Sequence, residues 1–207
     1  MAVYRIIEPD RGEIYIDGVD ITTIGLKKLR NSMCIVPQDP TLIEGTLRDN
    51  IDPLNQYKDE EIIQVLEELD FFEFMKTNNH NNTINTTRGL MFKIKEFGNN
   101  LSLGEKQLIC FARAILKKSK IIFLDEATAS LDQKTEDTIQ QAINKHFKSC
   151  TVLTIAHRVQ TIKQCDRILV MDKGKIAECD SPSKLLQNPK GIFYSLYYKN
   201  LQAMSNS

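Results

Sequence analysis

Residues 121–132 read IIFLDEATASLD, an apolar run of strand length that ends in two adjacent carboxylates, Asp125 and Glu126. Because ligands of a parallel sheet bind beyond the carboxyl ends of its strands, both carboxylates are expected where a phosphate group and its magnesium ion would lie. A magnesium ion takes hard oxygen ligands, which suits Asp125, and a water molecule that attacks phosphorus needs a base, which suits Glu126. Taken alone, an acidic dipeptide after a strand is more often a turn cap, so this interpretation depends on the motifs around it.

Short apolar strands alternate with amphipathic helices on both sides of this run. The residue patterns predict strands at 13–17, 33–36, 121–124 and 151–155, helices at 26–31, from Asp59, at 103–117 and at 135–147, and a hairpin that turns at 172–174. The opening residues carry apolar side chains at helical spacing and are predicted to be the last turns of a helix, and another helix is expected to start at Ser181. The alternation predicts an α/β fold with a mainly parallel sheet and helices packed on it.

The composition is that of a folded globular protein without a strong electrostatic field. Of 207 residues, 42% are hydrophobic and 26% are charged, and 27 lysines and arginines balance 27 aspartates and glutamates. This balance gives no support to binding of nucleic acid or of an anionic membrane surface. No apolar run reaches the roughly 18 to 20 residues of a membrane span, and the five cysteines include no Cys-x-x-Cys pair.

Four further motifs accompany the acidic pair. In chain order they are Pro37-Gln38, LSLGEKQ at 101–107, Ser130-Leu131-Asp132 and Ala156-His157-Arg158. With Asp125-Glu126 they make the chain resemble the nucleotide-binding domain of an ATP-binding cassette (ABC) transporter over essentially its whole length. The segments DGVDITTIGLKKLR, IVPQDP and EGTLRDNIDP further resemble the second nucleotide-binding domain of subfamily C, the multidrug-resistance-associated type.

The resemblance implies a role for each motif. Gln38 matches the glutamine-loop residue, LSLGE the family signature, Asp125-Glu126 the Walker B pair, Asp132 the D-loop and His157 the switch histidine. It implies ATP and Mg2+ as cofactors, Glu126, His157 and Gln38 as catalytic residues, Asp125 and Gln38 as metal ligands, and a nucleotide-binding set of Ser102, Leu103, Gly104, Glu105 and Asp132. Without the resemblance, Gln38 would be an ordinary strand-end amide and His157 a structural histidine. The other histidines, His80 and His146, are predicted to be solvated.

The signature segment also has a physical interpretation of its own. Ser102 and Glu105 have the spacing of a capping box, which would leave the amides of Leu103 and Gly104 directed outward at an anion. A glycine in a first helical turn costs up to about 1 kcal/mol relative to alanine, so close approach of a ligand is the preferred explanation for Gly104. The family usually has glutamine at the position of Glu105, and a carboxylate there would put negative charge near a γ-phosphate and weaken the signature.

The P-loop pattern G-x-x-x-x-G-K-S/T is absent from the sequence, and among nine glycines only Gly174 precedes a lysine. In the family the P-loop precedes a segment like RIIEPDRGEIYIDG, so the chain is interpreted as one incomplete nucleotide-binding domain over 1–207 that lacks the first strands and the P-loop. The expected fold is a P-loop NTPase-like ABC ATPase core with an α-helical subdomain. The expected divisions are the core up to the glutamine loop at 1–40, the helical subdomain at 41–117, the core with Walker B, D-loop and switch histidine at 118–180, and a C-terminal helix and tail at 181–207.

Three functions are compatible with these residues. The first is the ATP-binding and ATP-hydrolysing domain of a transporter that exports organic anions or similar solutes, although this chain alone is expected to hydrolyse little ATP. Its implied partners are a second nucleotide-binding domain in a head-to-tail ATP sandwich and the transmembrane domains, at the cytosolic face of a membrane. The alternative is a non-catalytic regulatory or interaction module that offers only its signature face. A soluble superfamily member that acts on nucleic acid is disfavoured by the zero net charge.

Overall fold

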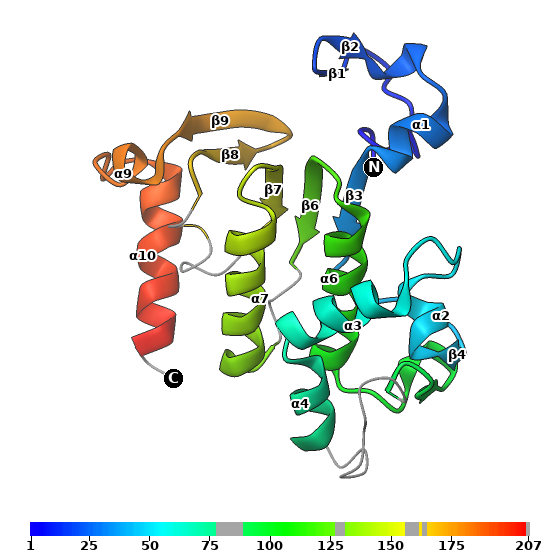
Figure 1. Cartoon of the computed structure of the whole chain (residues 1–207). Helices are drawn as coiled ribbons and strands as arrows, with labels where there is room; N and C mark the ends of the chain where they lie inside the picture. Colours follow the sequence, from blue (N-terminus) through cyan, green and yellow to red (C-terminus); the bar gives the residue numbers. More distant parts are fainter. Residues whose placement is uncertain (78–88, 127–130, 156–161, 163–164, 206–207) are drawn as a thin grey trace. The chain divides into compact units, whose positions relative to one another are not determined.

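The computed structural model describes residues 1–77, 89–126, 131–155, 162 and 165–205 (Figure 1). The chain divides into two compact units, Met1–Thr154 and Ile155–Ser207. The first unit begins with β1 (Tyr15–Ile16), β2 (Val19–Asp20), η1 (Ile21–Thr23), α1 (Leu26–Asn31), β3 (Met33–Val36), β4 (Gly45–Thr46), α2 (Leu47–Ile51), α3 (Asp59–Glu68) and α4 (Phe71–Thr77). It continues with β5 (Lys93–Ile94), η2 (Glu96–Gly98), α6 (Leu103–Lys117), β6 (Ile121–Asp125), α7 (Gln133–His146) and β7 (Thr151–Ile155).

The central sheet of the first unit has the strand order β3-β6-β7. Strands β3 and β6 run parallel, with Met33 opposite Ile121 and Val36 opposite Leu124. The residues that follow these strands therefore emerge at the same edge of the sheet, which places Gln38 near Glu126 in space. The bounds of β3, α1, α6 and β7 agree with the sequence-based predictions, and β6 is one residue longer.

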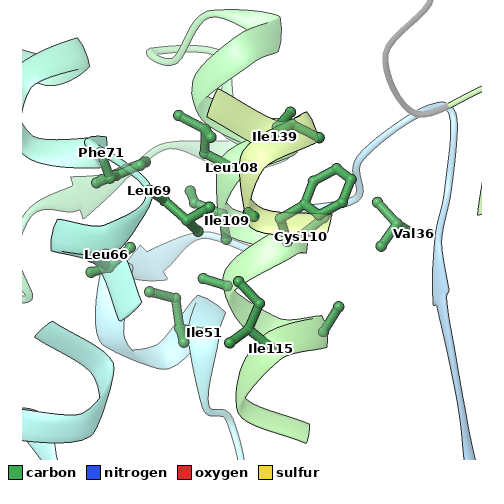
Figure 2. Close-up of a cluster of buried hydrophobic side chains, with 14 of the residues drawn as sticks. Val36, Ile51, Leu66, Leu69, Phe71, Leu108, Ile109, Cys110, Ile115 and Ile139 are labelled. Atoms are coloured by element: carbon green, nitrogen blue, oxygen red, sulfur yellow. The ribbon is translucent and has the colours of Figure 1, made fainter. Parts of the chain in front are cut away.

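Helix α6 lies at the centre of the hydrophobic core (Figure 2). Its residues Leu108, Ile109 and Phe111 are fully buried. The core around it also includes Leu66 of α3 and Ile139 of α7. A helix that is apolar on most of its circumference is an interior helix, so α6 serves as the support on which the sheet and the other helices of this unit pack.

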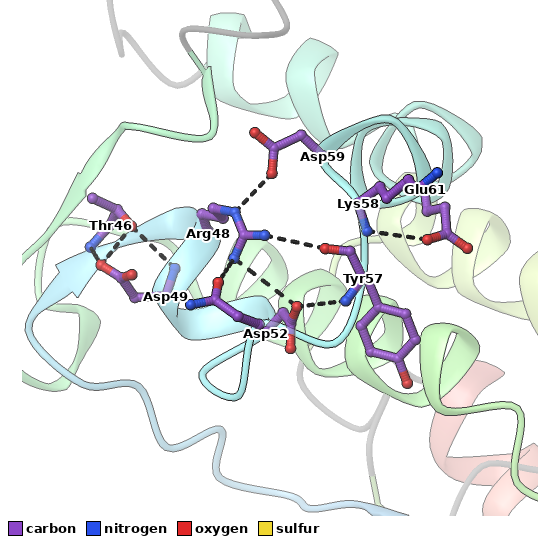
Figure 3. A network of polar contacts seen from close by, with 9 residues as sticks. Thr46, Arg48, Asp49, Asp52, Tyr57, Lys58, Asp59 and Glu61 are labelled. Atoms are coloured by element: carbon purple, nitrogen blue, oxygen red, sulfur yellow. Dashed lines mark hydrogen bonds and ion pairs between the residues drawn. The ribbon is translucent and has the colours of Figure 1, made fainter.

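A polar network joins the segment after β4 to α3 (Figure 3). The Nε of Arg48 donates to Asp59 at 2.7 Å, and its Nη2 donates to the carbonyl oxygen of Tyr57 at 3.1 Å. The carboxylate of Asp52, which is 3% exposed, accepts from the backbone amide of Tyr57 at 2.8 Å and lies 3.9 Å from Nη1 of Arg48. The planar guanidinium reaches several acceptors at once and so fixes the path between α2 and α3.

The second unit contains β8 (Ile168–Asp172), β9 (Lys175–Asp180), α9 (Pro182–Leu185) and α10 (Ile192–Ser205). Strands β8 and β9 form the predicted antiparallel hairpin. The carboxylate of Glu178 on β9 accepts from the backbone amides of Ile192 and Phe193 at 2.8 and 2.9 Å, which places a negative charge at the positive end of α10. A Cβ at Gly191 would stand 2.8 Å from that carboxylate, so this close contact explains the glycine.

Two sequence-based predictions about local structure are wrong. The opening residues form hydrogen-bonded turns and no helix, with the amide of Arg5 donating to the carbonyl oxygen of Ala2 at 2.8 Å and Arg5 itself at a φ of 48°. A residue in the left-handed conformation interrupts the path of a right-handed helix, so the turns do not continue as one. The strand predicted at 13–17 is shorter, because only Tyr15–Ile16 pairs, in a small hairpin with β2.

Candidate functional site

The structure joins two of the predicted catalytic residues, Gln38 and Glu126. The side-chain Nε2 of Gln38 donates to Oε2 of Glu126 at 3.1 Å, across 88 positions of sequence. Asp125, the last residue of β6, directly precedes Glu126 in the sequence, and it is half-buried. Three of the residues predicted to act in catalysis or metal binding thus follow the carboxyl ends of two parallel strands.

The backbone of Glu126 adopts a left-handed conformation, with a φ of 47°. For a residue with a Cβ this conformation costs about 1 kcal/mol or somewhat more. The strand cannot continue through such a residue, so the chain turns directly after Asp125 and presents the glutamate carboxylate to Gln38. An observed backbone strain of this kind is common where a side chain must be aimed at a ligand.

The oxygen ligands at this edge fit a magnesium ion that is bound mainly through a nucleotide. Because Gln38 donates through Nε2, the lone pairs of its Oε1 remain available to a cation. Mg2+ in such sites takes one or two protein oxygens and fills its other positions with phosphate and water. No group of three or more histidine, cysteine, aspartate or glutamate residues gathers in the described part of the chain, so a site built from protein ligands alone is not found there.

The first turn of α6 carries the predicted capping box. The Oγ of Ser102 accepts from the amide of Glu105 at 3.2 Å, and Oε2 of Glu105 accepts from the amide and hydroxyl of Ser102 at 2.7 and 2.9 Å. Glu105 is 1% exposed, so its carboxylate is engaged in the cap. Among the described residues no partner accepts from the amides of Leu103 and Gly104, as is general for the first turn of a helix, and anion binding there stays a prediction.

Gly104 has a packing reason that sequence reasoning missed. A Cβ at this position would lie 3.2 Å from Oγ1 and 3.3 Å from Cγ2 of Thr135, on α7. The close approach of two helices therefore requires a small residue whether or not a ligand binds. The preference for a ligand as the explanation of Gly104 is weakened accordingly.

Asp132 is the N-cap of α7. Its Oδ1 accepts from the amide of Thr135 at 3.0 Å, and its Oδ2 accepts from the hydroxyl of Thr135 at 2.6 Å. These hydrogen bonds hold the pKa of the Asp132 carboxyl below its usual value. Since Thr135 contacts both Asp132 and Gly104, the predicted signature and D-loop residues meet at one side chain.

The remaining predicted residues have different outcomes. His157 and His80 lie outside the described residues, as does Ser130. The prediction that His146 is solvated is wrong, because its Nε2 lies 2.8 Å from Oε2 of Glu68 on α3 and its side chain is only 22% exposed. The hydrogen bonds of Lys145 and Gln64 to the same carboxylate hold the pKa of Glu68 below its usual value.

Sequence reasoning also missed Gln107, the last residue of the LSLGEKQ segment. Its Nε2 donates to the carbonyl oxygens of Pro37 and Gln38, at 3.0 and 2.9 Å. The position of Gln107 on the buried face of α6 was predictable from helical periodicity, but its partners were not.

None of the described helices combines the length and the hydrophobicity that crossing a membrane requires.

Comparisons with known proteins identify relatives of the chain. The family model described as ABC transporter matches residues 1–129. ATP-binding cassette sub-family C member 2 of Homo sapiens is 49% identical over 192 residues, which cover 93% of this chain and 12% of that protein. Bile pigment transporter 1 of Saccharomyces cerevisiae is 44% identical over 210 residues, covering 96% of this chain and 13% of that protein.

A solved structure of a bacterial Atm1-family ABC exporter with ATP bound superposes with a TM-score of 0.84 at 32% identity, over 95% of this chain and 33% of that one. The chain thus spans about an eighth of the length of these curated relatives. The fold is the P-loop NTPase-like fold of ABC domains. The family model matches more than half of the residues of this chain, and subfamily C transporters are among its relatives. The chain therefore belongs to the ABC transporter family.

Proposed function

We propose that the chain is the ATP-binding and ATP-hydrolysing part of an ABC exporter of the subfamily C type. The observation that carries this proposal is the hydrogen bond between Gln38 and Glu126 at the carboxyl ends of β3 and β6. It brings together, from positions 88 residues apart, the two side chains that the resemblance assigns to the attacking water.

In this proposal each residue has a defined task. Asp125 and the Oε1 of Gln38 would hold Mg2+, which would supply positive charge to neutralise the phosphates of the nucleotide. Glu126 accepts a proton from a water molecule whose oxygen bonds to the γ-phosphorus, while the bond from that phosphorus to the β-bridging oxygen breaks and ADP leaves. His157 contacts the γ-phosphate. Nucleotide held by a partner domain is contacted by the signature and D-loop residues of this chain. These are Ser102, the amides of Leu103 and Gly104, Glu105 with its cap, and Asp132.

The partner is a second nucleotide-binding domain, arranged head to tail, and both act on transmembrane domains at the cytosolic face of a membrane. One relative is named as a bile pigment transporter, and we propose organic anions or similar solutes as the exported cargo. The proposed divisions are 1–40, the helical subdomain 41–117, 118–180 and 181–207, and helices α2, α3 and α4 all fall within the second. Because the sequence has no P-loop, the chain by itself is expected to hydrolyse little ATP.

The test measures ATP-dependent association and ATP hydrolysis in a mixture. The chain is combined with a P-loop-bearing nucleotide-binding domain of a subfamily C relative, whose own signature serine is replaced by arginine. We expect the chain to associate with the partner domain only when ATP and Mg2+ are present. ATP should then be hydrolysed at the partner's P-loop, and this hydrolysis should require the signature segment of this chain. Ser102→Arg in this chain should abolish the stimulation, and exposed Gln133→Arg is the matched control. Absence of ATP-dependent association would contradict the proposal.

A second candidate function is a non-catalytic module that offers only its signature face. The glutamate at position 105, where the resemblance implies glutamine, favours it. Glu126→Gln in this chain separates the two, when the chain is tested within a longer protein that supplies a P-loop in cis. A loss of at least half of the turnover is expected if Glu126 is a catalytic base, and unchanged turnover would favour the module.

A further inference from the structure

Gln107 is a buried side chain that holds the backbone of the glutamine loop. It is 2% exposed, and its carboxamide nitrogen donates to two consecutive carbonyl oxygens, those of Pro37 and Gln38. Carbonyl oxygens only accept hydrogen bonds, so the orientation of the amide is determined: Nε2 faces the loop and Oε1 faces away. The residue whose backbone is held in this way is the one whose side chain contacts Glu126.

The hydrogen bonds of Gln107 belong to a series along α6. Arg113 donates to the carbonyl oxygens of Thr41 and Asn50 at 3.2 and 2.6 Å. Lys117 donates to the carbonyl oxygen of Met33, at the start of β3, at 2.6 Å. One helix thus carries the donors that fix the chain before, within and after the glutamine loop.

The oxygen of the Gln107 carboxamide, Oε1, shows that a glutamine at this position has a cost in stability. Oε1 is buried and has no hydrogen-bond partner among the described residues. A buried acceptor without a partner destabilises the folded state, and each such group calls for an explanation. Methionine would fill a similar volume without an unsatisfied oxygen, so packing does not explain a glutamine. The two hydrogen bonds to the carbonyl oxygens of Pro37 and Gln38 explain it.

We propose that Gln107 is a positioning residue, which fixes the Pro37–Gln38 backbone and thereby holds the Gln38 carboxamide against Glu126. Gln107 stands on the same helix as Ser102 and Gly104, within two turns of them. Displacement of the first turn of α6 by bound nucleotide would therefore reach Gln38 through Gln107. The importance of this positioning for ATP hydrolysis rests on the proposed function. The positioning itself is testable without nucleotide.

The experiment observes the side-chain amide of Gln38 by 15N NMR in the full chain. Its resonance is identified by its loss in Gln38→Glu, and Glu126→Ala marks its position without the acceptor. In Gln107→Met we expect the Gln38 side-chain resonance to move at least half of the way to that position, and the 13C resonances of the Pro37 and Gln38 carbonyls, which lose their donor, to shift as well. The exposed glutamine of α3 provides the matched control, Gln64→Met, in which both readouts should stay unchanged.

An unchanged Gln38 resonance in a folded Gln107→Met variant would overturn the proposal. If that variant does not fold, Gln107→Asn retains the carboxamide but withdraws it by one methylene, and the same two readouts apply. Failure of both variants to fold would show that the residue holds the fold as a whole, which also overturns a positioning role. Because no ATP is present, a shifted resonance together with no ATP-dependent association would contradict the proposed function alone.

Discussion

At Gly104 an added methyl group would meet a neighbouring helix at close range. The added Cβ of Gly104→Ala would press on Thr135, which cannot withdraw because Asp132 holds its hydroxyl and amide. We expect the variant to be destabilised by about 1 kcal/mol despite the better helix propensity of alanine. In a Thr135→Ala background the same substitution should be neutral or stabilising. Urea unfolding of the four proteins in this cycle measures the coupling, and additivity of the two substitutions would contradict the contact.

Asp132, the N-cap of α7, makes a pH-dependent contribution to the free energy of unfolding. Because the pKa of its carboxyl is lowered in the folded state, its stabilisation is present above the unfolded-state pKa of about 3.9 and is lost as the pH falls through the folded-state value. Asp132→Ala should therefore lower the free energy of unfolding by about 1 kcal/mol at pH 7, and by less at pH 3. The control is Asp137→Ala, further along α7, which should change stability by under about 0.5 kcal/mol at both pH values. A difference that does not depend on pH would exclude the charged cap.

Among the elements, the segment from β4 to α3 depends most on one side chain. Arg48 contacts Asp59, the Tyr57 carbonyl and the buried carboxylate of Asp52 (Figure 3). Replacement by methionine leaves that carboxylate without its cation, and we expect a loss of about 2 kcal/mol, most of which lysine would fail to restore.

Thermal and urea unfolding of Arg48→Met and Arg48→Lys check this expectation. The comparison variant is Lys76→Met, since Lys76 forms an ion pair with Glu73 in which both side chains are well exposed. Such a pair contributes about 0 to 1 kcal/mol, so the control should lose much less. Equal losses in the two positions would mean that the network of Arg48 adds nothing beyond an ordinary surface ion pair.

At the scale of the whole molecule, the balance of 27 positive and 27 negative side chains gives no support to binding of nucleic acid. Fluorescence anisotropy with labelled duplex DNA and single-stranded RNA should show no saturable binding at micromolar protein between 50 and 200 mM salt. A basic control protein of similar size should bind and lose affinity over that range. Binding that weakens steeply with salt would revive the interpretation of a family member that acts on nucleic acid.

The sequence by itself determined the elements whose cause is local. The alternation of apolar residues and the turn at 172–174 predicted β3, β6, β7 and the β8–β9 hairpin, and the spacing of Ser102 and Glu105 predicted the first turn of α6. Periodicity and capping act within a few residues, so they can be read without coordinates. Short elements such as β4, α2 and β5 were missed, because two to five residues carry too little periodicity to be recognised.

The tertiary structure alone decided which distant residues meet. Gln107 and Gln38 are 69 positions apart, and Lys145 and Glu68 are 77 apart. The contact of Gly104 with Thr135 likewise depends on the path that α7 takes past α6. The motifs indicated which residues belong to one site, but side-chain hydrogen bonds form only over about 3 Å, a distance that the packing of helices on the sheet sets and that local sequence does not.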